Sequence, residues 1–254
     1  VTDKTEGNET DVSEETDSST INGDSETDED AYIDIQNPQL ESSSQIQPAN
    51  TSHVSDEEGL RKALNSGDTQ VILDRDITLT APLEIDNKNA IVIDGQSHKL
   101  QLNEGAMNKK QNMFVVKRSN GIVVKDVTIE DYYSAGISLY KTTNVFIEGV
   151  VLNGQPLTNS SDTRSNVGVD LDGSIAEIRD IESMNHNYGI RVRNESTLML
   201  DGWNEHTNDT NDIDSRITTG QENNVINDNS RNYSEWEVKP GSAYTSTIYK
   251  VKKL

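Results

Sequence analysis

The chain has 254 residues and carries 44 acidic against 22 basic side chains, a formal net charge of -22. This excess of negative charge disfavours phosphate binding, so neither nucleic acid nor an anionic membrane is expected as a partner. The sequence contains no cysteine, which excludes disulfides and thiol catalysis, and no apolar run approaches the roughly 20 residues of a membrane span.

The first 50 residues hold 14 of the acidic side chains and a single lysine, and they are rich in serine and threonine. Low hydrophobicity and like-charge repulsion do not offset the entropy of ordering such a segment. This composition predicts a disordered acidic leader over residues 1–50. Within it, residues 31–36 (AYIDIQ) alternate like a short strand, and whether they order stays open.

Residues 55–66 carry the pattern of a short helix. Ser55 is placed as an N-cap, and Glu58 three residues later completes a capping box. A helix of this length needs a surface to pack on, so we expect it to cap the N-terminal end of a domain spanning residues 51–254. The apolar face that would make this contact consists of Leu60, Ala63 and Leu64.

From Gln70 the hydrophobic period is two, and short strands alternate with Asn, Asp, Gly or Ser turns. Four segments align at a spacing near 22 residues, with one longer step explained by a polar insertion at about residues 154–166. No further helix is expected between the strands. A period near 22 with three short strands per repeat predicts an all-β fold, the parallel β-helix. The aligned inward positions are Val115, Ile137, Val169 and Ile190, then Val124, Ile147, Ile178 and Leu200.

This register predicts which side chains stack on the outer surface of the coils. Because neighbouring strands lie about 4.8 Å apart, like charges in one column would repel, and alternating charges fit the register. The first two columns are Ser138, Asp170 and Arg191, then Tyr140, Asp172 and Arg193. The third column is Lys125, Glu148, Arg179 and Asp201.

The region from about residue 205 is polar and turn-rich, and apolar and aromatic residues follow towards residue 254. The end of a β-helix exposes unpaired strand edges, so we expect an irregular C-terminal cap over about residues 205–254. No cofactor is expected, although a loose Ca²⁺ site stays open as an alternative in this region. Its acidic and amide residues are Asp209, Asn211, Asp212 and Asp214.

A set of motifs at the start of the predicted domain carries a resemblance to a known family. The motifs are Leu60, Ala63 and Leu64, then Asp76-Ile77-Thr78-Leu79, Pro82, Ile91, Ile93-Asp94-Gly95 and Leu100. In this order they resemble the pectate lyase-like adhesive domain of Gram-positive surface proteins. The resemblance covers roughly residues 55–205 and implies a right-handed parallel β-helix with a helical N-terminal cap. It also implies an adhesin, similar to the binding regions of serine-rich repeat adhesins, with host glycoproteins or plant polysaccharides as partners.

The outer columns admit an enzymatic interpretation and a structural one. Polysaccharide lyases on this scaffold use an Arg or Lys base and acidic side chains that hold Ca²⁺, and both residue types occur at Asp170, Asp172, Arg191 and Arg193. The same residues also form a ladder of ion pairs, and the presence of an Arg beside each Asp favours that interpretation. We therefore expect no catalytic residues, and we interpret His186, which falls in a turn, as a surface residue.

Tyrosines beside Asn, Asp and Arg are typical of carbohydrate-binding sites. Three tyrosines lie close together before and within one predicted strand, and a fourth precedes a later coil. The insertion at Gln155–Asn166 projects from one edge, where loops often carry recognition. The predicted ligand-binding residues are Tyr132, Tyr133, Tyr140, Asp170, Asp172, Tyr188, Arg191 and Arg193. The alternative for the tyrosines, ordinary packing at the corners of a solenoid, stays open.

These features together predict a non-catalytic, monomeric adhesive module of a bacterial protein, secreted and associated with the cell wall. Its expected partners are host or matrix glycans and glycoproteins of mucin or pectin type. Protonation of carboxylates near pH 4–5 would reduce repulsion from such anionic polymers, so binding is expected to strengthen on acidification. Two alternatives remain: a polyuronate lyase that uses Ca²⁺ and an Arg base, and a structural stalk without a ligand.

Overall fold

The computed structural model describes residues 49–107, 111–155, 166–202, 204–207, 211–217, 223–227, 233–240 and 245–253. The predicted leader, including residues 31–36, lies outside this range up to residue 48. Beyond Asn204, most side chains also lie outside the description, and only the backbone of those strands is used below.

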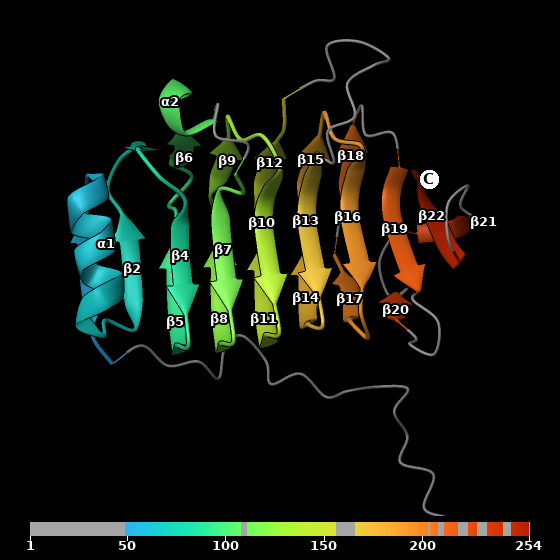
Figure 1. Ribbon diagram of the computed structural model, residues 1–254, viewed down its shortest axis with the longest axis horizontal. Helices are drawn as coiled ribbons and strands as arrows, with labels where there is room; N and C mark the ends of the chain where they lie inside the picture. Colours follow the sequence, from blue (N-terminus) through green and yellow to red (C-terminus); the bar gives the residue numbers. More distant parts are fainter. Residues whose placement is uncertain are drawn as a thin grey trace, which may run out of the picture. The chain divides into compact units, whose positions relative to one another are not determined.

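Three sheets make up the described part of the chain, and most strands in each run parallel (Figure 1). Sheet A contains β1 (Thr51–Val54), β2 (Gln70–Leu73), β5 (Asn89–Asp94), β8 (Asn120–Lys125), β11 (Thr143–Glu148), β14 (Ile175–Arg179), β17 (Thr197–Asp201) and β20 (Asn224–Asn227). Sheet B contains β3 (Ile77–Leu79), β6 (Lys99–Leu102), β9 (Thr128–Glu130), β12 (Val151–Asn153), β15 (Glu182–Met184) and β18 (Glu205–Thr207). Sheet C contains β4 (Leu83–Asp86), β7 (Phe114–Lys117), β10 (Ala135–Tyr140), β13 (Val167–Asp172), β16 (Tyr188–Arg193), β19 (Asn211–Ile217), β22 (Thr245–Lys253) and β21 (Tyr233–Pro240).

Each coil contributes one strand to sheet C, then one to sheet A and one to sheet B. Each of these strands pairs with the corresponding strand of the next coil. The pairing of Ile137 with Val169, and of Val169 with Ile190, is the predicted first inward column. The second predicted column, from Val124 through Leu200, also forms as expected. The parallel β-helix predicted from the sequence is therefore confirmed.

One position of the predicted register is wrong. Phe114, not Val115, pairs with Ile137 and points into the core, while Val115 pairs with Ser138 on the outer face. The cause is the run of four apolar residues at Met113–Val116, which offers no alternation from which to choose a face. A slip of one residue exchanges the two faces of a strand, so Val115 was predicted to point into the core although it lies on the outer face.

The helix α1 (Glu57–Ser66) covers the N-terminal end of the coils beside β2, as predicted (Figure 1). Its apolar face is buried and consists of Leu60, Ala63 and Leu64. The predicted capping box is wrong, because the N-cap is Asp56, whose Oδ1 accepts a hydrogen bond from the backbone N–H of Gly59 at 2.7 Å. Glu57 ties the helix to the β3–β4 turn by accepting from the backbone N–H of Thr80 at 3.0 Å.

The described strands continue beyond the predicted repeats by one further coil, formed by β18, β19 and β20. An antiparallel hairpin of β21 and β22 then pairs with β19 and lies at the opposite end of the coils from α1 (Figure 1). A short helix that the hydrophobic pattern does not predict, α2 (Glu104–Met107), follows β6. Both differences concern segments without a clear hydrophobic alternation.

Buried hydroxyl groups form a ladder at the corner between sheets C and A. The backbone N–H of Thr142 donates to Ser174 Oγ of the next coil at 3.1 Å, and the N–H of Ser174 donates to Ser196 Oγ at 3.0 Å. The N–H of Ser196 donates in turn to Asn223 Oδ1 at 3.0 Å. Each coil thus supplies an acceptor to a buried donor of the coil before it, which a buried turn requires.

Candidate functional site

Four of the predicted site residues form one cluster on the outer face of sheet C, here called the Asp–Arg cluster: Asp170, Asp172, Arg191 and Arg193. Arg191 donates from Nε and Nη2 to the two carboxylate oxygens of Asp170, at 2.8 and 2.7 Å. Arg193 also donates to Asp170, at 3.2 and 3.1 Å, and its Nη1 lies 2.9 Å from Asp172 Oδ2. The strand register places these residues, because β13 and β16 pair Asp170 with Arg191 and Asp172 with Arg193.

The charges of the Asp–Arg cluster balance one another. Burial by itself would raise the pKa of Asp170, but the hydrogen bonds and charges of Arg191 and Arg193 outweigh it and lower that pKa below its ordinary value. Burial would likewise lower the pKa of Arg193, and the bonds to Asp170 and the charge of Asp172 instead raise it. Arg193 is therefore held protonated, which is the wrong state for a base that abstracts a proton.

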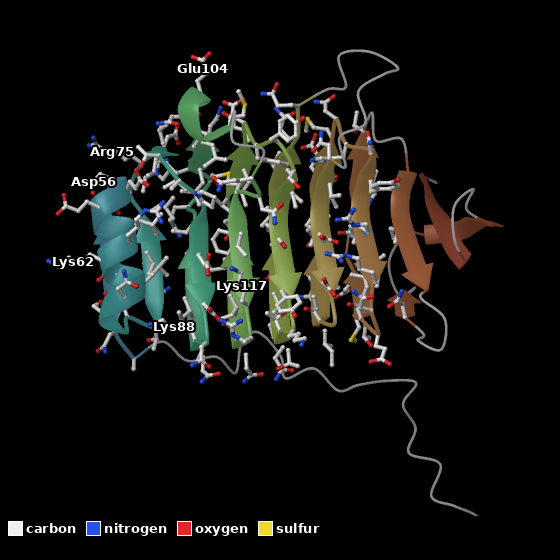
Figure 2. All side chains as sticks on the ribbon, viewed as in Figure 1. Asp56, Lys62, Arg75, Lys88, Glu104 and Lys117 are labelled. Atoms are coloured by element: carbon white, nitrogen blue, oxygen red, sulfur yellow. The ribbon has the colours of Figure 1, made fainter. Side chains whose placement is uncertain are left out.

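Tyr140 borders this cluster at the end of β10. Its register neighbours are Lys117 on one side and Asp172 on the other, and Lys117 is marked at the end of β7 in Figure 2. The side chain is 37% exposed, and among the described residues it is the only large apolar side chain with such exposure. The Nζ of Lys141 lies 5.3 Å from the centre of its ring. An exposed aromatic ring flanked by charged donors and acceptors can pack against a sugar and hydrogen-bond its hydroxyl groups.

Tyr132, another predicted binding residue, lies in the core and is fully buried. Its hydroxyl is 2.5 Å from His186 Nε2, and His186 Nδ1 is 3.0 Å from Ser183 Oγ. The interpretation of His186 as a surface residue is wrong, since it is only 2% exposed. No local sequence pattern indicates this network, because Tyr132 and His186 are 54 residues apart and belong to different coils.

The four predicted tyrosines do not come together as one aromatic platform. Tyr188 begins its strand whereas Tyr140 ends its own, and five residues along a strand correspond to about 17 Å. Tyr133 and Tyr188 are both half-buried, and Tyr133 lies before β10, also away from the Asp–Arg cluster. The structure therefore brings together Tyr140, Asp170, Asp172, Arg191 and Arg193.

The ends of the predicted insertion are tied to each other. The side chain of Asn166, which is fully buried, donates to the backbone carbonyl of Gln155 at 2.8 Å and to that of Asn185 at 2.8 Å. Residues 156–165 of the insertion lie outside the described residues.

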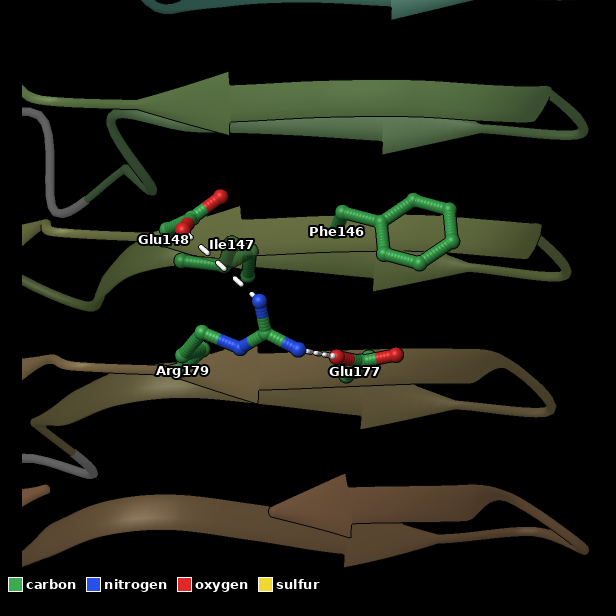
Figure 3. A pocket seen from close by; sticks show the side chains of 5 residues that line it. All are labelled: Phe146, Ile147, Glu148, Glu177 and Arg179. Carbon is green, nitrogen blue, oxygen red and sulfur yellow. Dashed lines mark hydrogen bonds and ion pairs between the residues drawn. The ribbon is translucent and has the colours of Figure 1, made fainter. Parts of the chain in front are cut away.

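A second charged surface follows sheet A. The predicted alternating column forms, and Asp94 adds a member by pairing with Lys125. Glu148, Glu177 and Arg179 line a small hollow beside Phe146 (Figure 3). Burial is the main cause of a raised pKa at Glu177.

Three of the four residues suggested for a Ca²⁺ site lie on one strand. Asn211, Asp212 and Asp214 fall on strand β19, and Asp209 lies outside the described residues. In the described part of the chain, no group of three or more His, Asp or Glu side chains is arranged to hold a metal ion. The helices found there are also too short or too polar to cross a membrane.

Residues 51–158 match the family model described as "Putative pectate lyase-like adhesive domain". This confirms the resemblance drawn from the motifs over the first four coils, and the match begins at the first residue of β1. The motif Ile93-Asp94-Gly95 has a structural reason: a Cβ at Gly95 would lie 2.4 Å from the Cβ of Val127 in the next coil. The comparison with curated proteins gives no match.

Two solved structures show a distant similarity. One is described as a "putative glycosyl hydrolase" from Parabacteroides merdae, with 10% identity and a TM-score of 0.38 over 63% of this chain and 96% of that one. The other is a pectate lyase from Xanthomonas campestris, with 11% identity and a TM-score of 0.24 over 77% of this chain and 82% of that one. Similarity at this level carries no argument about function.

Proposed function

We propose that this domain is a non-catalytic adhesive module that binds glycans or glycoproteins through the outer face of sheet C, with Tyr140 at the centre of the site. The observation that carries the proposal is the position of Tyr140, which is exposed between Lys117 and Asp172, with Arg193 one strand further along the same row. The match of residues 51–158 to an adhesive domain supports the same role. The partners are polysaccharides or host glycoproteins, and the domain acts outside the cell, on a bacterial surface.

The state of the Asp–Arg cluster supports binding rather than lysis. A polyuronate lyase needs a base that accepts a proton, whereas Arg191 and Arg193 both donate to the buried carboxylate of Asp170. In an adhesive site the same network is favourable, because its hydrogen bonds hold the side chains of Arg193 and Asp172 in a fixed orientation before a ligand binds.

We also propose that binding to anionic polymers strengthens at acidic pH. The formal net charge of -22 repels mucin-like or pectin-like chains at neutral pH. Protonation of exposed carboxylates near pH 4–5 removes part of this repulsion, while the Lys and Arg side chains keep their charge.

The test is saturable binding to immobilised mucin and polygalacturonate at pH 4.5 and pH 7, with the full chain. We expect binding at pH 4.5 that weakens several-fold at pH 7, and at least a tenfold loss of affinity in Tyr140→Ala. Tyr133→Ala is the matched control, since it removes a tyrosine away from the cluster, and both variants are checked for unchanged unfolding midpoints. Release of unsaturated uronate products would contradict the proposal, and absence of binding at both pH values would favour a stalk.

A further inference from the structure

An ammonium group without an ion-pair partner lies beside the exposed ring of Tyr140. Lys141 follows Tyr140 in the turn after β10, its side chain is exposed, and its Nζ lies 5.3 Å from the centre of the ring. No ion pair joins Lys141 to another residue in the described part of the chain. The attraction between a cation and an aromatic face at this distance favours a position of the ammonium group next to the ring.

The two cations on the N-terminal side of Tyr140 are neutralised by carboxylates of the preceding coil. Lys117, the register neighbour of Tyr140, has its Nζ 3.0 Å from Glu84 Oε1. Arg118, in the turn after β7, forms an ion pair with Asp86 at the end of β4. Both cations therefore have a carboxylate partner before any ligand arrives.

The carboxylate on the other side of Tyr140 is also occupied. Asp172 is the register neighbour of Tyr140 on β13. Its Oδ2 lies 2.9 Å from Arg193 Nη1, and its Oδ1 accepts a hydrogen bond from Asn194 Nδ2 at 2.6 Å. Because both oxygens are engaged by the following coil, this carboxylate does not compete for the ammonium group of Lys141.

The turn that carries Lys141 is fixed by the backbone and is open towards the next coil. The N–H of Lys141 donates to the carbonyl of Asp172 at 2.9 Å, and its φ of 52° sets the left-handed turn. The next coil has Gly173 at the corresponding position, where a Cβ would lie 3.7 Å from Lys141 Cγ. Because glycine has no side chain, nothing at this position screens Lys141 from a ligand that packs on Tyr140.

We propose that the site at Tyr140 selects saccharides whose ring carries a carboxylate, and that Lys141 determines this selectivity. The apolar face of the sugar packs on the ring of Tyr140, and the sugar carboxylate becomes the ion-pair partner of Lys141. This contact is attractive although the chain as a whole, with a formal net charge of -22, repels anionic polymers. The inference rests on the proposed glycan site and adds the class of sugar that it takes.

The test compares each acidic sugar with its own methyl ester, which keeps the ring and removes the charge. The two pairs are trigalacturonate and its ester, for a uronic acid of a polysaccharide, and sialyllactose and its ester, for a sialic acid of a glycoprotein. Affinities for the full chain are measured by calorimetry at pH 5, where an ordinary carboxylic acid with a pKa of about 3.9 is mostly ionised.

Three variants separate the role of Lys141 from a general effect of charge. Lys141→Met keeps the length of the side chain and removes the ammonium group, and Lys141→Arg keeps the positive charge. The matched control is Lys62→Met, which removes the same charge from the exposed face of α1 at the N-terminal end of the coils (Figure 2).

We expect the parent chain to bind at least one acid about three- to fivefold tighter than its ester, which is the strength of one exposed ion pair. Lys141→Met should bind acid and ester equally, with the affinity for the ester unchanged, whereas Lys141→Arg and Lys62→Met should keep the preference. The acid that shows the preference identifies the source of the sugar.

Equal affinity of the parent chain for acid and ester would overturn this inference, and so would a preference that survives in Lys141→Met or disappears in Lys62→Met. In each of these cases binding of the esters would leave the glycan site at Tyr140 standing. Absence of binding to all four sugars would overturn the proposed function together with this inference.

Discussion

Arg191 reaches across from β16 and holds Asp170 of β13 with two parallel hydrogen bonds of 2.8 and 2.7 Å. The side chain of Asp170 is 5% exposed and that of Arg191 is 14% exposed, so this pair is far more enclosed than a typical surface ion pair. Bidentate geometry of this kind is both strong and directional.

Arg191→Ala is therefore expected to destabilise the domain by about 2–4 kcal/mol, because a buried carboxylate loses one of its two guanidinium partners. Arg193 remains, which keeps the loss below that of a fully orphaned charge. Urea unfolding measures the effect, with Arg191→Lys as an intermediate variant that keeps the charge but not the fork. A loss below about 0.5 kcal/mol would show that the pair acts as a surface ion pair.

Acidification is expected to remove the contribution of Asp170. Its pKa is lowered in the folded state, so the unfolded chain binds the proton more readily. The stabilisation is complete above the ordinary Asp pKa of about 3.9 and is lost as pH falls through the lower folded value. In Asp170→Asn, the change in unfolding free energy between about pH 5 and pH 2 should be smaller than in the parent chain, and an unchanged slope would argue against this assignment.

The N-cap of α1 offers a test on adjacent residues. Asp56→Ala should cost about 0.5–2 kcal/mol, because the N–H of Gly59 loses its acceptor. Ser55→Ala is the matched control and should be within about 0.5 kcal/mol of the parent. Equal losses in the two variants, measured by chemical denaturation, would restore the capping box predicted from the sequence.

Gly95 should tolerate no side chain. In Gly95→Ala the new methyl group meets Val127 Cβ at 2.4 Å and the carbonyl of Asp126 at 2.5 Å, both on the following coil. Because backbone must move to relieve this overlap, we expect a lower unfolding midpoint and a loss of at least about 2 kcal/mol. Gly67→Ala is the control, because it introduces backbone strain without a clash: Gly67 has a φ of 89° and open space around it.

The sequence predicted the β-helix and two of the outer columns of sheet C because its alternation is clear where strands are half-buried. Ile137, Val169 and Ile190 share a column for that reason. Once this inward column is set, the register also determines which charged side chains are neighbours on the outer face. The register failed at Val115, where a continuous apolar run carries no information about which side faces inward.

The candidate site was predictable in part. The Asp–Arg cluster follows from the period of the repeat, and so does the neighbourhood of Tyr140. The burial of Tyr132 does not, because its hydroxyl is satisfied by His186 from another coil and no local pattern reports such a partner. The coil made by β18–β20 was also missed, since Asn- and Asp-rich strands resemble loops when read by composition.

The hydroxyl ladder at the corner of sheets C and A gives the solenoid a direction. The N–H of Ser174 relies on Ser196 of the following coil, and the N–H of Ser196 relies on Asn223. Removing a coil from the C-terminal end leaves a buried donor orphaned in the coil before it, whereas α1 shields the other end. Under a mechanical load the domain should accordingly unzip coil by coil from its C-terminal side, with each detachment weakening the next coil in line.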